Sequence, residues 1–136
     1  MLIVDTGPLV AVGDLDDPHY ARCKELLETD PGPLTTTALV IAEAGYLLSR
    51  GLGSFAELAL IEMVRDGTLI VEVLIATDWD RVHELIEKYA DLGLGVTDAS
   101  IVAVAERLNV TRIATLDHRH FRVVRPEHCK AFELLP

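Results

Sequence analysis

The chain has 136 residues, half of them hydrophobic, and this predicts one domain over residues 1–136 that buries a core without disulfides. A net charge of −10, from 12 basic and 22 acidic residues, argues on its own against a nucleic-acid-binding protein. No apolar stretch approaches the roughly 20 residues of a membrane span, and the mean hydropathy of +0.30 excludes a disordered chain.

The first part of the chain predicts strands that alternate with helices. Residues 2–4 form an apolar β-branched run, typical of a strand covered on both faces, and Pro8 suits the first position of a short helix. The elements expected next are a helix over 17–29 stopped by the Pro-Gly-Pro run at 31–33, a strand over 34–36, and an almost wholly apolar, buried helix over 38–50 ended by Gly51.

The second part continues the alternation. Ser54 and Glu57 have the spacing of a capping box that opens a helix to about residue 66. The elements expected after it are a strand over 69–74, an amphipathic helix over 77–89 with Trp79, Val82, Ile86 and Tyr89 along one stripe, a buried helix over 98–108, a strand over 112–115, and short strands near 123–124 and 131–132. This order predicts an α/β sandwich with a mostly parallel sheet.

Four carboxylates interrupt apolar stretches. Asp5 is the only charged residue among the first 13, Glu43 is alone between Pro31 and Ser49, and Asp98 is alone between residues 92 and 105. Asp117 closes the apolar run 113–116. Since an ionised carboxylate is costly among buried residues unless it is compensated, these acids need a cation from elsewhere.

The expected elements bring these acids together. Asp5 and Asp117 each follow a strand, and ligands of open α/β sheets bind beyond the carboxyl ends of the strands. Asp98 begins a helix beside Thr97, a candidate cap, whereas Glu43 lies in mid-helix. A cap or turn role remains an alternative for any single acid, but it does not explain Glu43. Because the ligand set contains only oxygen, it favours Mg²⁺ or Mn²⁺ over zinc.

Basic residues gather near the C-terminus. Between residues 112 and 130 there are five of them and only two acids, with three histidines interleaved. Either this segment is an ordinary solvated surface, or it faces phosphates beside the metal site. The candidate RNA contacts are Arg112, Arg119, Arg122, His118 and His120.

The two cysteines form no CxxC motif. No basic region or apolar core of a signal peptide precedes Asp5. We therefore expect a cytoplasmic protein in which Cys23 and Cys129 are reduced and structural.

Four motifs carry a family resemblance. They are Asp5-Thr6 after the first strand, Glu43 in ALVIAEAGYLL, Thr97-Asp98-Ala99 before an Ala-rich helix, and Ile113-Ala114-Thr115-Leu116-Asp117 followed by Phe121. Their order and spacing resemble the PIN-domain pattern from residue 2 to about 125. The stretch from Tyr89 to Phe121 is particularly similar to the VapC-type toxins of bacterial toxin–antitoxin pairs.

The resemblance implies a three-layer sandwich and a Mg²⁺- or Mn²⁺-dependent endoribonuclease. Its substrate would be single-stranded or looped RNA (tRNA, rRNA or mRNA), and a VapB-like antitoxin would restrain it. The family's catalytic and metal-binding acids fall on Asp5, Glu43, Asp98 and Asp117. Thr6 and Thr115 fall on supporting positions, and Asp91 matches a frequently acidic one.

Other classes are weaker alternatives. A catalytically inactive PIN-fold module that binds protein or RNA would gain nothing from four converging acids. A receiver domain needs an adjacent pair of acids at a strand end, and Asp16-Asp17 is not at one. A dinucleotide fold fails because Gly93 and Gly95 lack a third glycine opening a helix. The apolar helices 38–49 and 54–64 favour a homodimer.

Overall fold

The computed structural model describes residues 1–136 and contains one five-stranded sheet. The strand order is β3-β2-β1-β4-β5, and all four pairings are parallel, which confirms the predicted α/β architecture. The strands are β1 (Leu2–Val4), β2 (Leu34–Thr37), β3 (Ile70–Glu72), β4 (Arg112–Ala114) and β5 (Glu133–Leu135).

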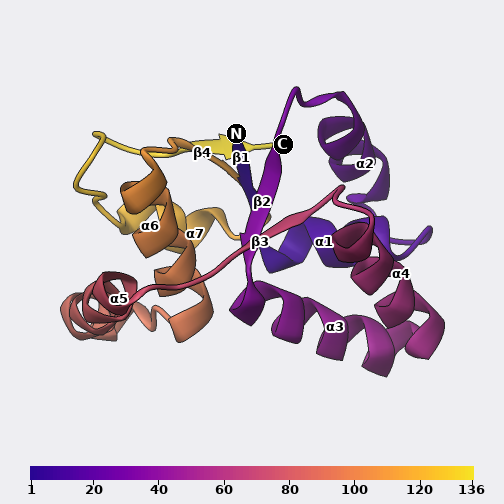
Figure 1. Cartoon of the computed structure of the whole chain (residues 1–136), viewed down its shortest axis with the longest axis horizontal. Helices are drawn as coiled ribbons and strands as arrows, with labels where there is room; N and C mark the ends of the chain where they lie inside the picture. The colour runs from indigo at the N-terminus through magenta and orange to yellow at the C-terminus, as the bar shows by residue number, and fades with distance from the viewer.

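Helices cover both sides of the sheet, which makes three layers. Figure 1 shows α1 to α4 on one side of the strands and α5 to α7 on the other. Their bounds are α1 (Thr6–Val12), α2 (Tyr20–Thr29), α3 (Ala38–Leu52), α4 (Ser54–Arg65), α5 (Ala76–Lys88), α6 (Val96–Leu108) and α7 (His118–Val123), with a 3₁₀ turn η1 (Ala90–Leu92) before α6. None of these helices combines the length and apolarity needed to cross a bilayer.

The core lies around β1 and α6. Leu2, Ile3 and Val4 are fully buried, as expected for a central strand with helices on both faces. In α6, every residue from Ala99 to Ala105 is buried, and four small side chains let neighbouring elements approach closely. The threonines of β2 are also buried. The Thr36 hydroxyl donates to the Val4 carbonyl at 2.7 Å, and the Thr37 and Ser100 hydroxyls are 3.0 Å apart.

Several predicted helix ends are wrong. The helix α1 begins at Thr6, so Pro8 is its third residue rather than its first. The helix α3 passes through Gly51 and stops at Gly53, whose φ of 102° is a conformation that L side chains rarely adopt. That same glycine is the N-cap of α4, and there is no side-chain capping bond, so the capping box predicted at Ser54 does not form.

Further corrections concern caps and strands. Gly95, not Thr97, is the N-cap of α6. No strand forms at 123–124, because the Asp117 side chain caps a helix there and the buried Phe121 anchors it. Tertiary packing thus overrides the local strand preference of the valines. The last strand, β5, begins at Glu133, directly after the predicted strand at 131–132.

The buried face of α5 contains a charge that the pattern did not predict. Trp79 is exposed, whereas Asp78 is only 3% exposed, with Val82 and Leu85 beside it. The Nε atom of Arg107, from α6, lies 3.0 Å from Oδ2 of Asp78.

Two arginines complete an ion-pair network between these helices. Besides Asp78, Arg107 reaches Glu72 of β3 at 3.0 Å. Arg81 of α5 donates twice to Glu106 of α6, at 2.7 and 2.9 Å. We call this set the α5–α6 ion-pair network; its members are Glu72, Asp78, Arg81, Glu106 and Arg107.

Candidate active site at the carboxyl ends of the strands

A pocket of about 710 Å³ opens where β1 and β4 end. All four carboxylates singled out by the sequence line it, and no lysine or arginine does. The lining residues are Asp5, Thr6, Gly7, Glu43, Gly93, Gly95, Val96, Thr97, Asp98, Leu116, Asp117 and His120.

Asp5 is the most enclosed of the four acids, with 4% of the residue exposed. It ends β1 and caps α1, and its Oδ1 accepts a hydrogen bond from the Thr6 backbone N–H at 2.7 Å. Its Oδ2 accepts from the Thr115 hydroxyl, also at 2.7 Å. Both oxygens of this carboxylate are therefore held in place by neutral donors.

Glu43 lies across the pocket mouth from Asp5. The Thr6 hydroxyl donates to its Oε2, so Thr6 contacts both acids. The helix α3, expected to be a buried helix, is buried along one side only. Its fully buried residues are Val40, Ala44, Gly45 and Leu48, and Glu43 is exposed. Its carboxylate faces solvent through the pocket rather than being buried among apolar side chains.

Thr115 also connects Asp5 to Asp117. Its hydroxyl donates to Asp5 and accepts from the Asp117 backbone N–H at 3.0 Å. The Asp117 side chain, 44% exposed, caps α7 by accepting from the His120 N–H at 3.4 Å. The strand end and the helix start thus fix the position of this acid.

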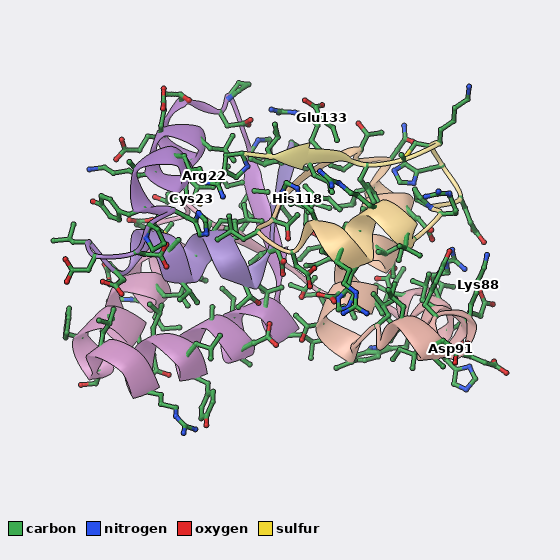
Figure 2. The ribbon with its side chains drawn as sticks, turned by 180° about the vertical axis from the view of Figure 1, so that it is seen from behind. Arg22, Cys23, Lys88, Asp91, His118 and Glu133 are labelled. Atoms are coloured by element: carbon green, nitrogen blue, oxygen red, sulfur yellow. The ribbon has the colours of Figure 1, made fainter.

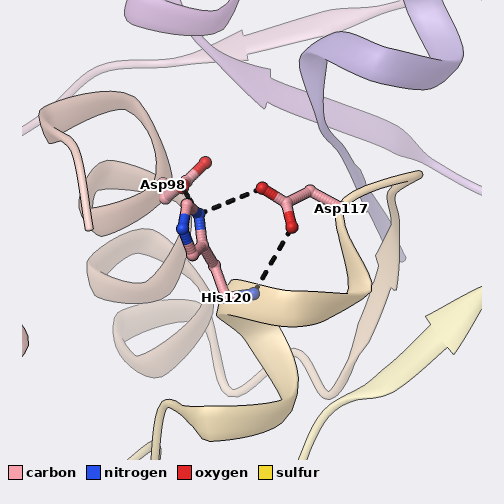
Figure 3. Close-up of side chains that lie close together, drawn as sticks. All are labelled: Asp98, Asp117 and His120. Carbon is pink, nitrogen blue, oxygen red and sulfur yellow. Dashed lines mark hydrogen bonds and ion pairs between the residues drawn. The ribbon is translucent and has the colours of Figure 1, made fainter. Parts of the chain in front are cut away.

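The imidazole of His120 lies between Asp98 and Asp117. His120 Nδ1 is 2.7 Å from Asp98 Oδ2 and 3.0 Å from Asp117 Oδ2. Figure 3 shows the ring reaching from α7 toward Asp98 at the start of α6. The three side chains can each offer one ligand atom, and these atoms lie within 4.8 Å of one another.

Burial and mutual repulsion oppose the ionisation of these acids. Burial raises the pKa of Asp5 from 3.8 to about 6, against the lowering effect of its bonds from Thr115 and Thr6; the Asp98 and Glu43 charges raise it further. Burial likewise raises the pKa of Asp98, and Asp117 and Glu43 add to the rise, while His120 opposes it. The pocket therefore favours a bound cation.

The donor set fits a divalent metal ion. Carboxylate oxygens come from four acids on four elements, hydroxyls of Thr6 and Thr115 orient two of them, and no side-chain ammonium or guanidinium competes. Hard oxygen donors of this kind suit Mg²⁺ or Mn²⁺.

The basic residues are divided between two ends of the sheet. Arg119 and Arg122 are exposed on α7, next to the pocket, and an Arg122 nitrogen lies 3.3 Å from His118 Nδ1. Arg112 instead begins β4, at the opposite end of the strand from Asp117. It pairs there with Asp30 at 2.7 Å and Glu133 at 3.6 Å. The structure does not bring Arg112 to the pocket.

The position of His120 differs from what the sequence suggested, whereas Asp91 is the surface acid at a helix end that the sequence favoured. His120 was expected on a phosphate-facing segment, yet its ring contacts two of the acids. The signal for this was its position three residues after Asp117, which places both on one side of a helix once 118–123 is helical. Asp91 lies in η1 and does not line the pocket. Figure 2 shows it with Lys88 at the outer edge of the molecule.

Comparisons with known proteins bear on both family and fold. A family model described as the PIN domain matches residues 2–126. Ribonuclease VapC26 of Mycobacterium tuberculosis is 31% identical over 135 residues, which cover 99% of this chain and 100% of that protein. The crystal structure of Mycobacterium tuberculosis VapC20, described as a Sarcin-Ricin loop cleaving toxin, has a TM-score of 0.82 at 22% identity. The match covers 88% of this chain and 92% of that one. At this level of identity it shows that the two chains share a fold.

Proposed function

The chain belongs to the PIN-domain family, and from that premise we propose that it is an endoribonuclease that acts as the toxin of a VapBC-type toxin–antitoxin pair. The observation that carries the proposal is the pocket where Asp5, Glu43, Asp98 and Asp117 meet without any lysine or arginine. The full-length likeness to a ribonuclease supports the same activity. The domain occupies residues 1–136, since β5 pairs with β4 beyond the family match.

The cofactor of this proposal is Mg²⁺ or Mn²⁺, held by the four acids. When bound, such an ion lowers the pKa of water and stabilises the charge that develops at a phosphodiester. Thr6 and Thr115 keep the Asp5 carboxylate in one orientation. Glu43 and Asp117 reach solvent, so either carboxylate can accept the proton of the attacking water.

The substrate of this proposal is single-stranded or looped RNA. The pocket itself is acidic, so RNA phosphates need the cation to approach it, and the exposed face of α7 supplies positive charge beside it. Arg119, Arg122 and His118 lie there. Contacts of this kind position the RNA backbone without reading its bases.

An RNA cleavage assay tests the activity. With Mg²⁺ or Mn²⁺, the purified protein should cut total RNA, and chelator should stop it. Asp5→Asn and Asp98→Asn should each lower the rate at least about 100-fold, because each removes a charge that holds the metal. Asp91→Asn, which changes an acid outside the pocket, is the matched control and should cut at the wild-type rate.

Two results would oppose this function. Cleavage that survives in chelator, or in Asp5→Asn, would exclude the metal mechanism. A folded protein that binds RNA but never cuts it would favour the inactive binding module. In cells, wild type should arrest growth unless a VapB-like antitoxin is co-expressed, and Asp98→Asn should not.

We also propose a cytoplasmic homodimer that assembles through α3 and α4. Both helices expose large apolar side chains on the surface: Tyr46, Leu47, Phe55, Leu58 and Ile61. Such a patch is unusual for a monomer. Light scattering should give about twice the 14.9 kDa chain mass, and Leu58→Glu should return it to one chain. A monomeric wild type at micromolar concentration would exclude this dimer.

A further inference from the structure

We propose that His120 is a nitrogen ligand of the metal in this pocket, and that it makes the site bind Mn²⁺ more tightly than Mg²⁺. This inference rests on the proposed function, which it deepens by naming the preferred cation. The four acids themselves supply only oxygen donors, and the helix α7 adds the imidazole of His120 beside them.

The imidazole nitrogen is located between two proposed ligands. Nδ1 of His120 lies 2.7 Å from one Asp98 oxygen and 3.0 Å from one Asp117 oxygen. Adjacent ligands of an octahedral ion bound at about 2.1 Å are roughly 3 Å apart. Both distances from Nδ1 are therefore close to those between neighbouring ligands of one ion, and all three ligand atoms lie within 4.8 Å of one another.

The position of His120 is fixed by the fold rather than by a flexible side chain alone. Asp117 caps α7 at the His120 N–H. The next residue, Phe121, is buried and packs edge-on against Phe132, with ring centroids 6.4 Å apart. His120 and Asp98 are each 18% exposed. A preorganised ring of this kind costs little entropy to bind a metal.

The contacts of Nδ1 show which edge of the ring faces the acids. Two carboxylate oxygens lie within hydrogen-bond distance of this nitrogen. A cation held by Asp98 and Asp117 would meet Nδ1 at the same place, and the nitrogen lone pair would ligate it, with any hydrogen on that nitrogen released to solvent. The ring then supplies a donor that the carboxylates cannot.

A nitrogen donor changes the metal preference. Imidazole suits first-row transition metals, whereas Mg²⁺ prefers carboxylate, carbonyl and water oxygens. The four acids alone bind either ion, so the preference for Mn²⁺ comes from His120. The sequence left Mg²⁺ and Mn²⁺ open, and this inference names Mn²⁺ as the preferred ion.

Pulsed electron paramagnetic resonance of bound Mn²⁺ tests ligation without any measurement of activity. Wild type with one equivalent of Mn²⁺ should show ¹⁴N modulation from the imidazole. His120→Gln and His120→Asn should both lose it, and calorimetry should show the Mn²⁺ affinity lowered about tenfold, with Mg²⁺ affinity changed less than threefold. His83→Gln, which removes an exposed histidine of α5, is the control and should keep the modulation.

The outcomes separate this inference from the proposed function. Absence of ¹⁴N modulation in wild type, or its persistence in both folded His120 variants, overturns the role of His120. If RNA is cut in that case, the nuclease proposal survives alone. If the modulation is present and RNA is not cut, the nitrogen ligand stands and the nuclease proposal fails.

Discussion

Buried acids have different kinds of partner in the pocket and in the α5–α6 ion-pair network. Asp5 and Asp78 are almost equally enclosed, at 4% and 3% exposed. Asp78 faces the guanidinium of Arg107, whereas Asp5 is met only by a backbone N–H and a hydroxyl. Burial alone therefore does not distinguish a structural acid from one proposed to bind a metal. The contacting groups do: a guanidinium contacts Asp78, whereas only neutral donors contact Asp5.

The electrostatic consequences follow from these partners. Hydrogen bonds from Arg107 to Asp78, and from Arg81 to Glu106, raise the pKa of each guanidinium, so both arginines keep their positive charge. In the pocket the pKa of Asp5 rises to about 6, chiefly through burial. Each acid of the network contacts a guanidinium of the chain itself, while the acids of the pocket need a cation from outside it.

The largest expected effect comes from breaking the network. Arg107→Met keeps an unbranched apolar stem but leaves the Asp78 carboxylate buried without its cation. Loss of one partner of a buried pair costs about 3 kcal/mol or more. Chemical denaturation should show this loss in the free energy of unfolding, while RNA cleavage by the folded fraction stays at the wild-type rate.

An exposed ion pair provides the control for that change. Arg65 and Glu62 of α4 are 2.8 Å apart, but both side chains are well exposed. Arg65→Met should change stability by less than about 0.5 kcal/mol. Equal effects of the two substitutions would mean that the burial of Asp78 contributes nothing.

A smaller and opposite effect is expected in the pocket. Because the pKa of Asp5 is about 6 in the folded protein, against 3.8 for an unperturbed aspartate, the folded chain binds the proton more tightly than the unfolded chain does. Without metal, wild type should therefore lose stability relative to Asp5→Asn as pH rises from about 4 to 6. At pH 7 the variant should be more stable by about 3 kcal/mol, since one pKa unit corresponds to about 1.4 kcal/mol.

Metal should reverse that ranking. If the pocket binds Mn²⁺ or Mg²⁺, either ion should raise the melting temperature of wild type, with little effect on Asp5→Asn. If Asp5→Asn instead unfolds more readily than metal-free wild type at pH 7, the Asp5 carboxylate is structural, as Asp78 is.

The sequence could predict the place of the pocket because two of its acids, Asp5 and Asp117, follow strands. In a parallel sheet the carboxyl ends of the strands meet at one edge, so Asp5 and Asp117 converge once their strands are recognised. The ion-pair network could not be predicted in the same way. Asp78 and Arg107 are 29 residues apart on two helices, and only the packing of α5 against α6 brings them together.

His120 shows the same limit within the site. The residues after Asp117 do not have the length or periodicity of a helix, so the contact of the ring with Asp98 depends on a short helix that tertiary packing stabilises. Glu43 was predicted on the inward side of a buried helix. Its helix is half exposed. Thr6 is the residue that connects Glu43 to Asp5, because its hydroxyl donates to Glu43 and its backbone N–H donates to Asp5.

The hydrogen bond between Thr115 and Asp5 joins residues 110 positions apart, and this has a consequence for synthesis of the protein. The strand β1 lies beside β4 at the middle of the sheet, so Asp5, the first of the proposed catalytic acids, leaves the ribosome long before its neighbours Asp117 and His120. A nascent chain that ends before residue 112 lacks β4 and cannot close the pocket. The ribosome would thus complete almost the entire polypeptide before this proposed toxin acquires a working site.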